Sequence, residues 1–171
     1  MRGAKVLLRA PGPADQATFL AAAANSKKLH APWVTAPSTV TQYQAYVARM
    51  AEPANRGYLV CVHDAQGEHM AGVINLTNMI HGAFRSGYLG YYAFAGFERQ
   101  GLMRAGMKAV LKAAFTQLKL HRLEANIQPG NSTSIALVKA CGFVQEGYSP
   151  RYLKIGGRWR DHERWAVLAD R

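Results

Sequence analysis

The stretch Glu98-Arg99-Gln100-Gly101-Leu102-Met103 separates an aromatic segment, 89–94, from a periodic apolar segment that carries Arg104, Lys108 and Lys112. The first segment predicts a strand and the second a helix. A glycine-bearing loop that leads into a helix leaves backbone N–H groups without intrahelical partners, and the helix dipole adds positive charge there. Basic side chains four residues apart then lie along one helix face. The stretch therefore predicts a cradle for an anionic group such as a pyrophosphate.

The composition predicts one domain over residues 1–171. With 171 residues, 49% of them hydrophobic, the chain can bury one core but is too short for two ordinary domains. The net charge of +11, from 21 basic and 10 acidic residues, favours anionic partners such as phosphates, acidic proteins or ribosomal RNA. The alternative is a generally basic protein, because no run of like charges stands out.

The cysteines and the apolar segments indicate a compartment. Cys61 and Cys141 are far apart among apolar neighbours, which is no disulfide framework. No segment has the apolar length of a signal peptide or a membrane span. The six histidines lack the spacing of a zinc site, so no metal is expected. These features predict a cytoplasmic protein with no membrane partner.

Periodicity and turn residues predict the remaining elements. The segment 121–128 alternates, with Leu123, Ala125 and Ile127 on one side and polar residues on the other, as expected for a strand with one apolar face. The expected strands are 6–9, 58–62, 70–76, 87–94, 121–128, 144–152 and 159–168. The expected helices are 14–24, 40–50, 100–118 and 132–140.

Several motifs in this order point to one family. They are Leu89-Gly90-Tyr91-Tyr92, Gln100-Gly101-Leu102-Met103, Pro129-Gly130-Asn131-Ser132-Thr133-Ser134, Cys141-Gly142-Phe143 with Glu146-Gly147-Tyr148, and Gly157-Arg158-Trp159-Arg160-Asp161-His162. Together they resemble the GNAT N-acetyltransferase superfamily over almost the whole chain. In detail they are similar to its RimJ/RimL-type branch, the ribosomal-protein alanine N-acetyltransferases. The last motif points to RimJ-like members in particular.

The resemblance implies a fold and a cosubstrate. The fold is α/β, with a mixed, largely antiparallel central sheet of about six or seven strands flanked by about four helices. The cosubstrate is acetyl-coenzyme A, with its pantetheine along the strand near Ala93 and Phe94 and a further contact to Asn131. Its pyrophosphate is expected on the backbone of Arg99, Gln100, Gly101, Leu102, Met103 and Arg104.

Two positions of the loop depart from the superfamily pattern. The usual loop begins with glutamine or arginine and ends with glycine or alanine, where this chain has Glu98 and Met103. A carboxylate near a pyrophosphate repels it unless the side chain points away or pairs with Arg99 or Arg104.

The resemblance also implies direct attack of an amine on the acetyl thioester in a ternary complex. A backbone N–H near Ala93 or Phe94 is expected to stabilise the oxyanion. Many members use a glutamate base and a tyrosine acid where this chain has Asn126 and Val138. Glu124 is the candidate replacement for the base. Hydroxyl donors to the departing sulfur are Ser134, Tyr148 and Tyr152, and Trp33, Asn126 and Asp161 are expected at the acceptor.

The missing acid and base favour one class of amine. Near neutral pH an α-amine is roughly a quarter unprotonated, whereas a lysine amine is unprotonated in about one molecule per thousand. The expected function is therefore acetylation of a protein N-terminal amine, with a ribosomal protein as partner and ribosomal RNA as a further contact. The alternatives are acetylation of a small amine, such as an antibiotic or polyamine, and a non-catalytic RNA- or ribosome-binding module. The sequence does not indicate an oligomeric state.

Overall fold

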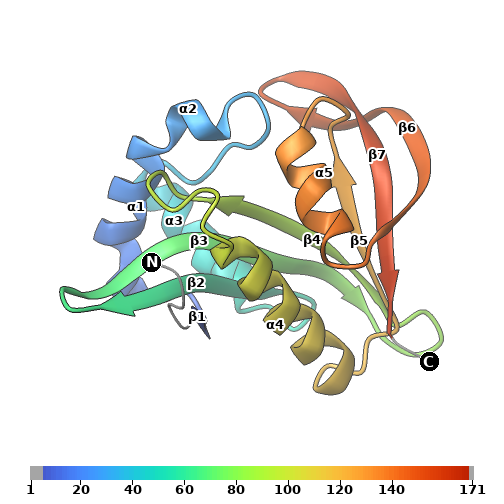
Figure 1. Cartoon of the computed structure of the whole chain (residues 1–171), viewed down its shortest axis with the longest axis horizontal. Helices are drawn as coiled ribbons and strands as arrows, with labels where there is room; N and C mark the ends of the chain where they lie inside the picture. The colour runs from blue at the N-terminus through green and yellow to red at the C-terminus, as the bar shows by residue number, and fades with distance from the viewer. Residues whose placement is uncertain (1–5, 170–171) are drawn as a thin grey trace.

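A seven-stranded sheet forms the centre of the computed structural model, which describes residues 6–169 (Figure 1). The strands are β1 (Val6–Arg9), β2 (Arg56–Asp64), β3 (Gly67–Ile80), β4 (Ser86–Ala93), β5 (Arg122–Ile127), β6 (Val144–Ile155) and β7 (Arg158–Leu168). Their order in the sheet is β1-β2-β3-β4-β5-β7-β6, and only the β4–β5 pair is parallel. The expected mixed, largely antiparallel sheet is confirmed.

Five α-helices accompany the sheet. They are α1 (Gln16–Asn25), preceded by a 3₁₀ turn over Pro13–Asp15, α2 (Lys27–His30), α3 (Val40–Met50), α4 (Leu102–Thr116) and α5 (Ser132–Lys139). The sequence did not predict α2, because four residues carry no apolar period and this turn is held by contacts to β4 described below. No helix within 6–169 has the length and apolar character needed to cross a membrane.

Two apolar layers cover the two faces of the sheet. On one face α4 and α5 bury residues such as Met107 and Val110, both fully inaccessible. Each such side chain contributes about 1.5–3 kcal/mol by leaving water. On the other face α1 and α3 pack Phe19 and Tyr43 against Phe94 and its neighbours. Burial on one stripe of each helix explains why the 3.6-residue period predicted the longer helices.

Helix caps follow the local sequence. Thr39 Oγ1 accepts from Gln42 N at 3.2 Å at the start of α3, and Asn131 Oδ1 accepts from Ser134 N at 3.1 Å at the start of α5. Each bond satisfies an N–H that the first helical turn leaves unpaired. Gly142, with φ +87°, follows α5 in the left-handed conformation that commonly ends a helix. Both helices thus begin at residue types that are preferred as N-caps.

The two parallel strands in the middle of the sheet separate. Strand β4 pairs with β5 only over Ser86–Tyr88, opposite 122–124, whereas its pairing with β3 continues to Ala93. From Leu89 onward one edge of β4 therefore has no strand beside it. This gap lies between the two layers of helices and organises the site.

Candidate active site

The backbone at the end of β4 presents donors and acceptors to the gap. Phe94 N–H donates to Ala71 O at 2.8 Å, so it points toward β3. Because N–H directions alternate along a strand, those of Tyr91 and Ala93 point the other way, toward the gap. The Ala93 carbonyl lies on that side too and accepts a hydrogen bond from His30 Nε2 at 2.9 Å. Of the two amides named from the sequence, the Ala93 amide is the one that faces the gap.

The loop before α4 carries a set of unpaired amides. The first intrahelical bond of α4 runs from Ala105 N to Gly101 O. Among the described residues, the N–H groups of 98–104 have no hydrogen-bond acceptor. Gly101 has φ +78°, and a Cβ placed on it would meet nothing within 4 Å. Free amides, open space and the positive end of a 15-residue helix fit a diphosphate.

Glu98 turns back onto its own loop. Its Oε2 accepts from Gly96 N at 2.8 Å, while Gln100 Nε2 donates to Gly96 O at 2.8 Å. The expected alternatives were that the carboxylate points away or pairs with Arg99 or Arg104, and no ion pair of Glu98 occurs within 6–169. The Glu98 side chain thus stabilises the loop. It does not neutralise Arg99 or Arg104, so their charges are available to a ligand.

A pair of hydroxyls joins β4 to α5. Tyr91 Oη lies 2.6 Å from Ser134 Oγ, so one hydroxyl donates to the other. Burial raises the pKa of the Tyr91 phenol well above its ordinary value, which keeps it protonated. Ser134 was a candidate from the sequence, but Tyr91 was missed as a functional residue. The sequence feature that could have identified Tyr91 is its phenol on the apolar face of β4, two residues after the buried Leu89.

Two residues of β5 face the side opposite to Tyr91. Leu123, Ala125 and Ile127 point into the layer of α4 and α5, so Glu124 and Asn126 face the layer of α1 and α3. Glu124 Oε1 accepts from Arg122 Nε at 2.7 Å, and Arg122 also pairs with Glu146. Asn126 Oδ1 is buried and has no partner among residues 6–169. Asn126, at the position of the usual base, thus offers a buried acceptor that no described residue engages.

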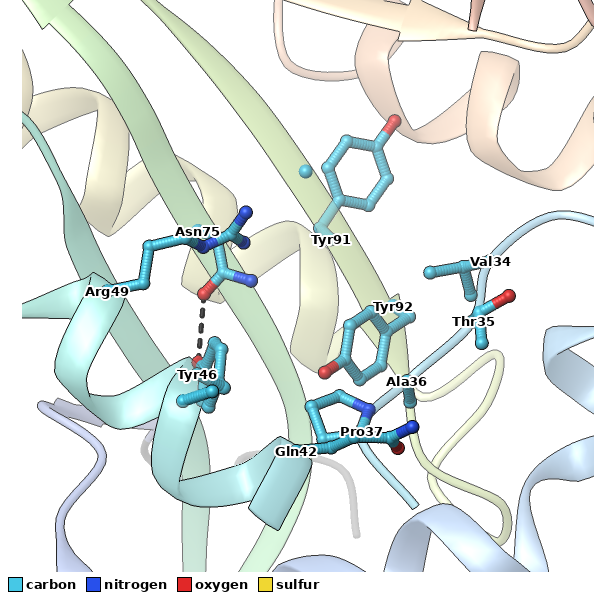
Figure 2. Close-up of a pocket in the computed structure, with 12 residues that line it drawn as sticks. Val34, Thr35, Ala36, Pro37, Gln42, Tyr46, Arg49, Asn75, Tyr91 and Tyr92 are labelled. Carbon is cyan, nitrogen blue, oxygen red and sulfur yellow. Dashed lines mark hydrogen bonds between the residues drawn. The ribbon is translucent and has the colours of Figure 1, made fainter. Parts of the chain in front are cut away.

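A cleft of about 500 Å³ opens beside β4 on the same side (Figure 2). Tyr91 and Tyr92 project to opposite sides of β4, and Tyr92 faces the cleft together with Tyr46 and Arg49 of α3. The full lining is Val34, Thr35, Ala36, Pro37, Gln42, Ala45, Tyr46, Arg49, Asn75, Gly90, Tyr91 and Tyr92. Its contact with β4 makes this cleft the candidate acceptor site.

None of the three predicted acceptor residues, Trp33, Asn126 and Asp161, belongs to this lining. Trp33 O accepts from Gln128 Nε2 at 3.3 Å, and the Trp33 ring would be 3.2 Å from a Cβ on Gly130. Trp33 therefore packs on the turn between β5 and α5.

Tyr148 and Asp161 pair with each other on the β6–β7 hairpin, through a hydrogen bond from the phenol to the carboxylate. That bond raises the pKa of Tyr148 and lowers the pKa of Asp161. An exposed phenol with a raised pKa is a poorer proton donor. Tyr148 and Asp161 thus contact each other, and neither belongs to the lining of the cleft.

Comparisons with known proteins agree with this geometry. Residues 5–144 match the acetyltransferase (GNAT) domain family. The probable N-acetyltransferase YjcK of Bacillus subtilis is 31% identical over 75% of this chain and 68% of its own length. The uS5-alanine N-acetyltransferase of Escherichia coli is 36% identical over 58% of this chain, which spans about half, 51%, of that enzyme. The spermidine N(1)-acetyltransferase of Vibrio cholerae is 27% identical over 84% of this chain and 82% of its length.

A solved structure agrees over a longer range. Mycobacterium smegmatis RimJ in complex with CoA-disulfide superposes with a TM-score of 0.86 and 27% identity, over 96% of this chain and 82% of that one. The resemblance found in the sequence is thereby confirmed, including its RimJ-type relatives. The described part of the chain contains no cluster of three or more residues suited to hold a metal ion. The chain belongs to the GNAT acetyltransferase family and is an acetyl-coenzyme A dependent N-acetyltransferase.

Proposed function

We propose that this enzyme acetylates the N-terminal α-amine of a protein, and that the protein is ribosomal. The observation that carries the proposal is the absence of a free base beside the gap among the described residues, because Asn126 replaces the usual glutamate and Glu124 is held by Arg122. A site without a base suits an amine that is already partly unprotonated. The similarity to the uS5-alanine enzyme supports the ribosomal acceptor.

Each side chain and amide has a separate role in the proposed transfer. When bound, acetyl-coenzyme A supplies the thioester carbonyl that the amine attacks. The free amides of 98–104 hold the diphosphate, and Ala93 N–H donates to the carbonyl oxygen as its charge develops. Asn126 Oδ1 accepts an N–H of the amine and so directs its lone pair. The hydroxyl pair of Tyr91 and Ser134 offers a hydrogen bond to the departing sulfur. The thiolate, with a pKa of about 8.5 by analogy with cysteine, takes up the proton that the attacking amine loses.

Glu124→Gln should leave kcat/KM and its pH profile unchanged, because the carboxylate is engaged by Arg122 rather than offered to the amine. The matched control is Glu146→Gln, which removes the other carboxylate of Arg122. Steady-state rates between pH 6 and 9 would check this. If Glu124 is the base, acting through a water, Glu124→Gln alone lowers kcat/KM and changes the acidic limb of the profile, where the base becomes protonated.

A polyamine is the competing acceptor, supported by the similarity to a spermidine acetyltransferase. A polycation needs carboxylates in its site, and the cleft lining contains none. Its single charged residue, Arg49, repels a polyamine. The cleft therefore favours a peptide N-terminus over spermidine.

Two peptides test the proposal directly. One has a free N-terminal alanine and an internal lysine, and the other is identical but α-blocked. After incubation with acetyl-coenzyme A, we expect mass spectrometry to locate the acetyl group on the α-amine of the first peptide only. Acetyl-lysine in both would overturn the proposal, as would acetylation of spermidine alone. No acetylation of either peptide would also count against the proposed acceptor.

A further inference from the structure

The polar side chains of the cleft offer hydrogen-bond donors and few free acceptors. Tyr46 Oη donates to Asn75 Oδ1 at 2.9 Å (Figure 2). Gln42 Oε1 accepts from both N and Oγ of Ser38, at 2.8 and 3.0 Å. The oxygens of both amides are thus engaged, and their NH₂ groups remain for a ligand.

Two more groups of the lining strengthen this bias. Tyr92 Oη is buried and has no hydrogen-bond partner in the described structure. Burial raises the pKa of Tyr92 far above its ordinary value, so the phenol is a neutral O–H. Thr35 adds an exposed hydroxyl, which donates or accepts equally well. A buried hydroxyl left unpaired is unfavourable, and a hydrogen-bond acceptor on a ligand would satisfy it.

Arg49 is the only charged residue of the cleft. Its guanidinium forms no ion pair within residues 6–169, although other arginines of the chain, Arg9 and Arg122, are each paired with two carboxylates. A guanidinium presents a fork of donors that matches a carboxylate. The ligand complementary to this cleft therefore carries an anion and accepts hydrogen bonds.

The register of the sheet gives the distance along β4 from Asn75, which lines the cleft together with Arg49, to the amide expected beside the reacting amine. Asn75 pairs with Gly90 on β4, and Gly90 precedes Ala93 by three residues, or about 10 Å at the rise of a strand. An extended acceptor with its amine at the Ala93 amide spans that distance with about three residues.

We propose that the cleft recognises an acidic side chain near the N-terminus of the acceptor, at its second to fourth residue, with Arg49 as its ionic partner. The inference rests on the proposed function and narrows its substrate class. It makes Arg49 a specificity-determining residue, whereas the proposed function assigns binding of the thioester to β4 and binding of the amine to β5. The donors of Asn75, Gln42 and Tyr92 supplement the ion pair.

The test compares peptides that differ only in carrying Glu or Gln at the third residue after an N-terminal alanine. For the unmodified enzyme we expect the Glu peptide to have a kcat/KM about tenfold to a hundredfold higher, chiefly through KM, as for a hydrogen-bonded charge. Arg49→Gln should remove the preference, and Arg49→Glu should shift it toward a Lys peptide. The preference should also shrink with added salt.

The matched control is Gln44→Glu, which changes the charge of α3 by the same amount at an exposed position outside the lining. It should retain the preference. Equal use of both peptides by the unmodified enzyme would overturn the inference and leave N-terminal acetylation intact. Acetylation of neither peptide would contradict the proposed function. An Arg49-dependent acetylation of free glutamate would then show that the recognised carboxylate belongs to a small amino acid.

Discussion

Gly101→Val should weaken coenzyme A binding about tenfold to a hundredfold. Gly101 has φ +78°, which costs a β-branched residue about 1–3 kcal/mol. The chain can relieve this strain by rotating the peptide groups on either side, and those groups belong to the amides that have no partner in the described structure. The added methyl groups also fill the open space before α4. Isothermal titration with coenzyme A measures the loss.

Gly82→Val is the matched control for this variant. Gly82 has φ +72° and nothing within 4 Å of an added Cβ, but it lies in the turn between β3 and β4. Thermal unfolding should show a similar loss of stability for both variants, because the backbone strain is similar. Only Gly101→Val should lose affinity, and an equal loss in both would contradict a binding role for the loop before α4.

His30→Leu should lower kcat about tenfold to a hundredfold, with a smaller effect on KM for acetyl-coenzyme A. His30 is only 5% exposed, and its Nε2 donates to the carbonyl of Ala93, the residue whose amide faces the gap. Ser26 Oγ accepts from Ala95 N at 2.9 Å, so the end of α1 and α2 together hold the end of β4. Without the histidine the Ala93 amide loses its fixed direction, and small displacements of such a donor cost this much in rate.

The kcat–KM split distinguishes positioning from general destabilisation. Tyr43→Phe removes a half-buried hydrogen bond of 2.8 Å to Gly12 O, in the same helical layer but away from the Ala93 amide, so it should lower stability without lowering kcat. His30→Gln keeps an N–H donor and should restore part of the rate. A kcat for His30→Leu equal to that of Tyr43→Phe would refute the positioning role.

Most of the fold could be predicted from local sequence patterns. The alternation in β5, the apolar stripe of α4 and the caps at Thr39 and Asn131 depend on neighbours in sequence, so they could be predicted from it. The short helix α2 could not, because its contacts from Ser26 and His30 reach residues more than sixty positions away.

The candidate site also has one part that the sequence predicts and another that depends on contacts made by the fold. The loop before α4 was visible as a glycine and a helix start, whereas the hydroxyl contact between Tyr91 and Ser134 joins residues brought together only by the fold. The engagement of Glu124 by Arg122 was also missed, although the two residues lie on one face of a predicted strand. A pattern shows which face a side chain takes, but its partner depends on packing across strands.

The short pairing of β4 with β5 makes the sheet two leaves joined at one end. Hydrogen bonds fix the separation of the leaves only over Ser86–Tyr88, and further along the separation is set by side chains such as Tyr91 against Ser134. Substitution changes side-chain packing more easily than a backbone ladder. The angle between the leaves can thus diverge among relatives while strand β4 is kept, which gives one scaffold room for acceptors of different bulk.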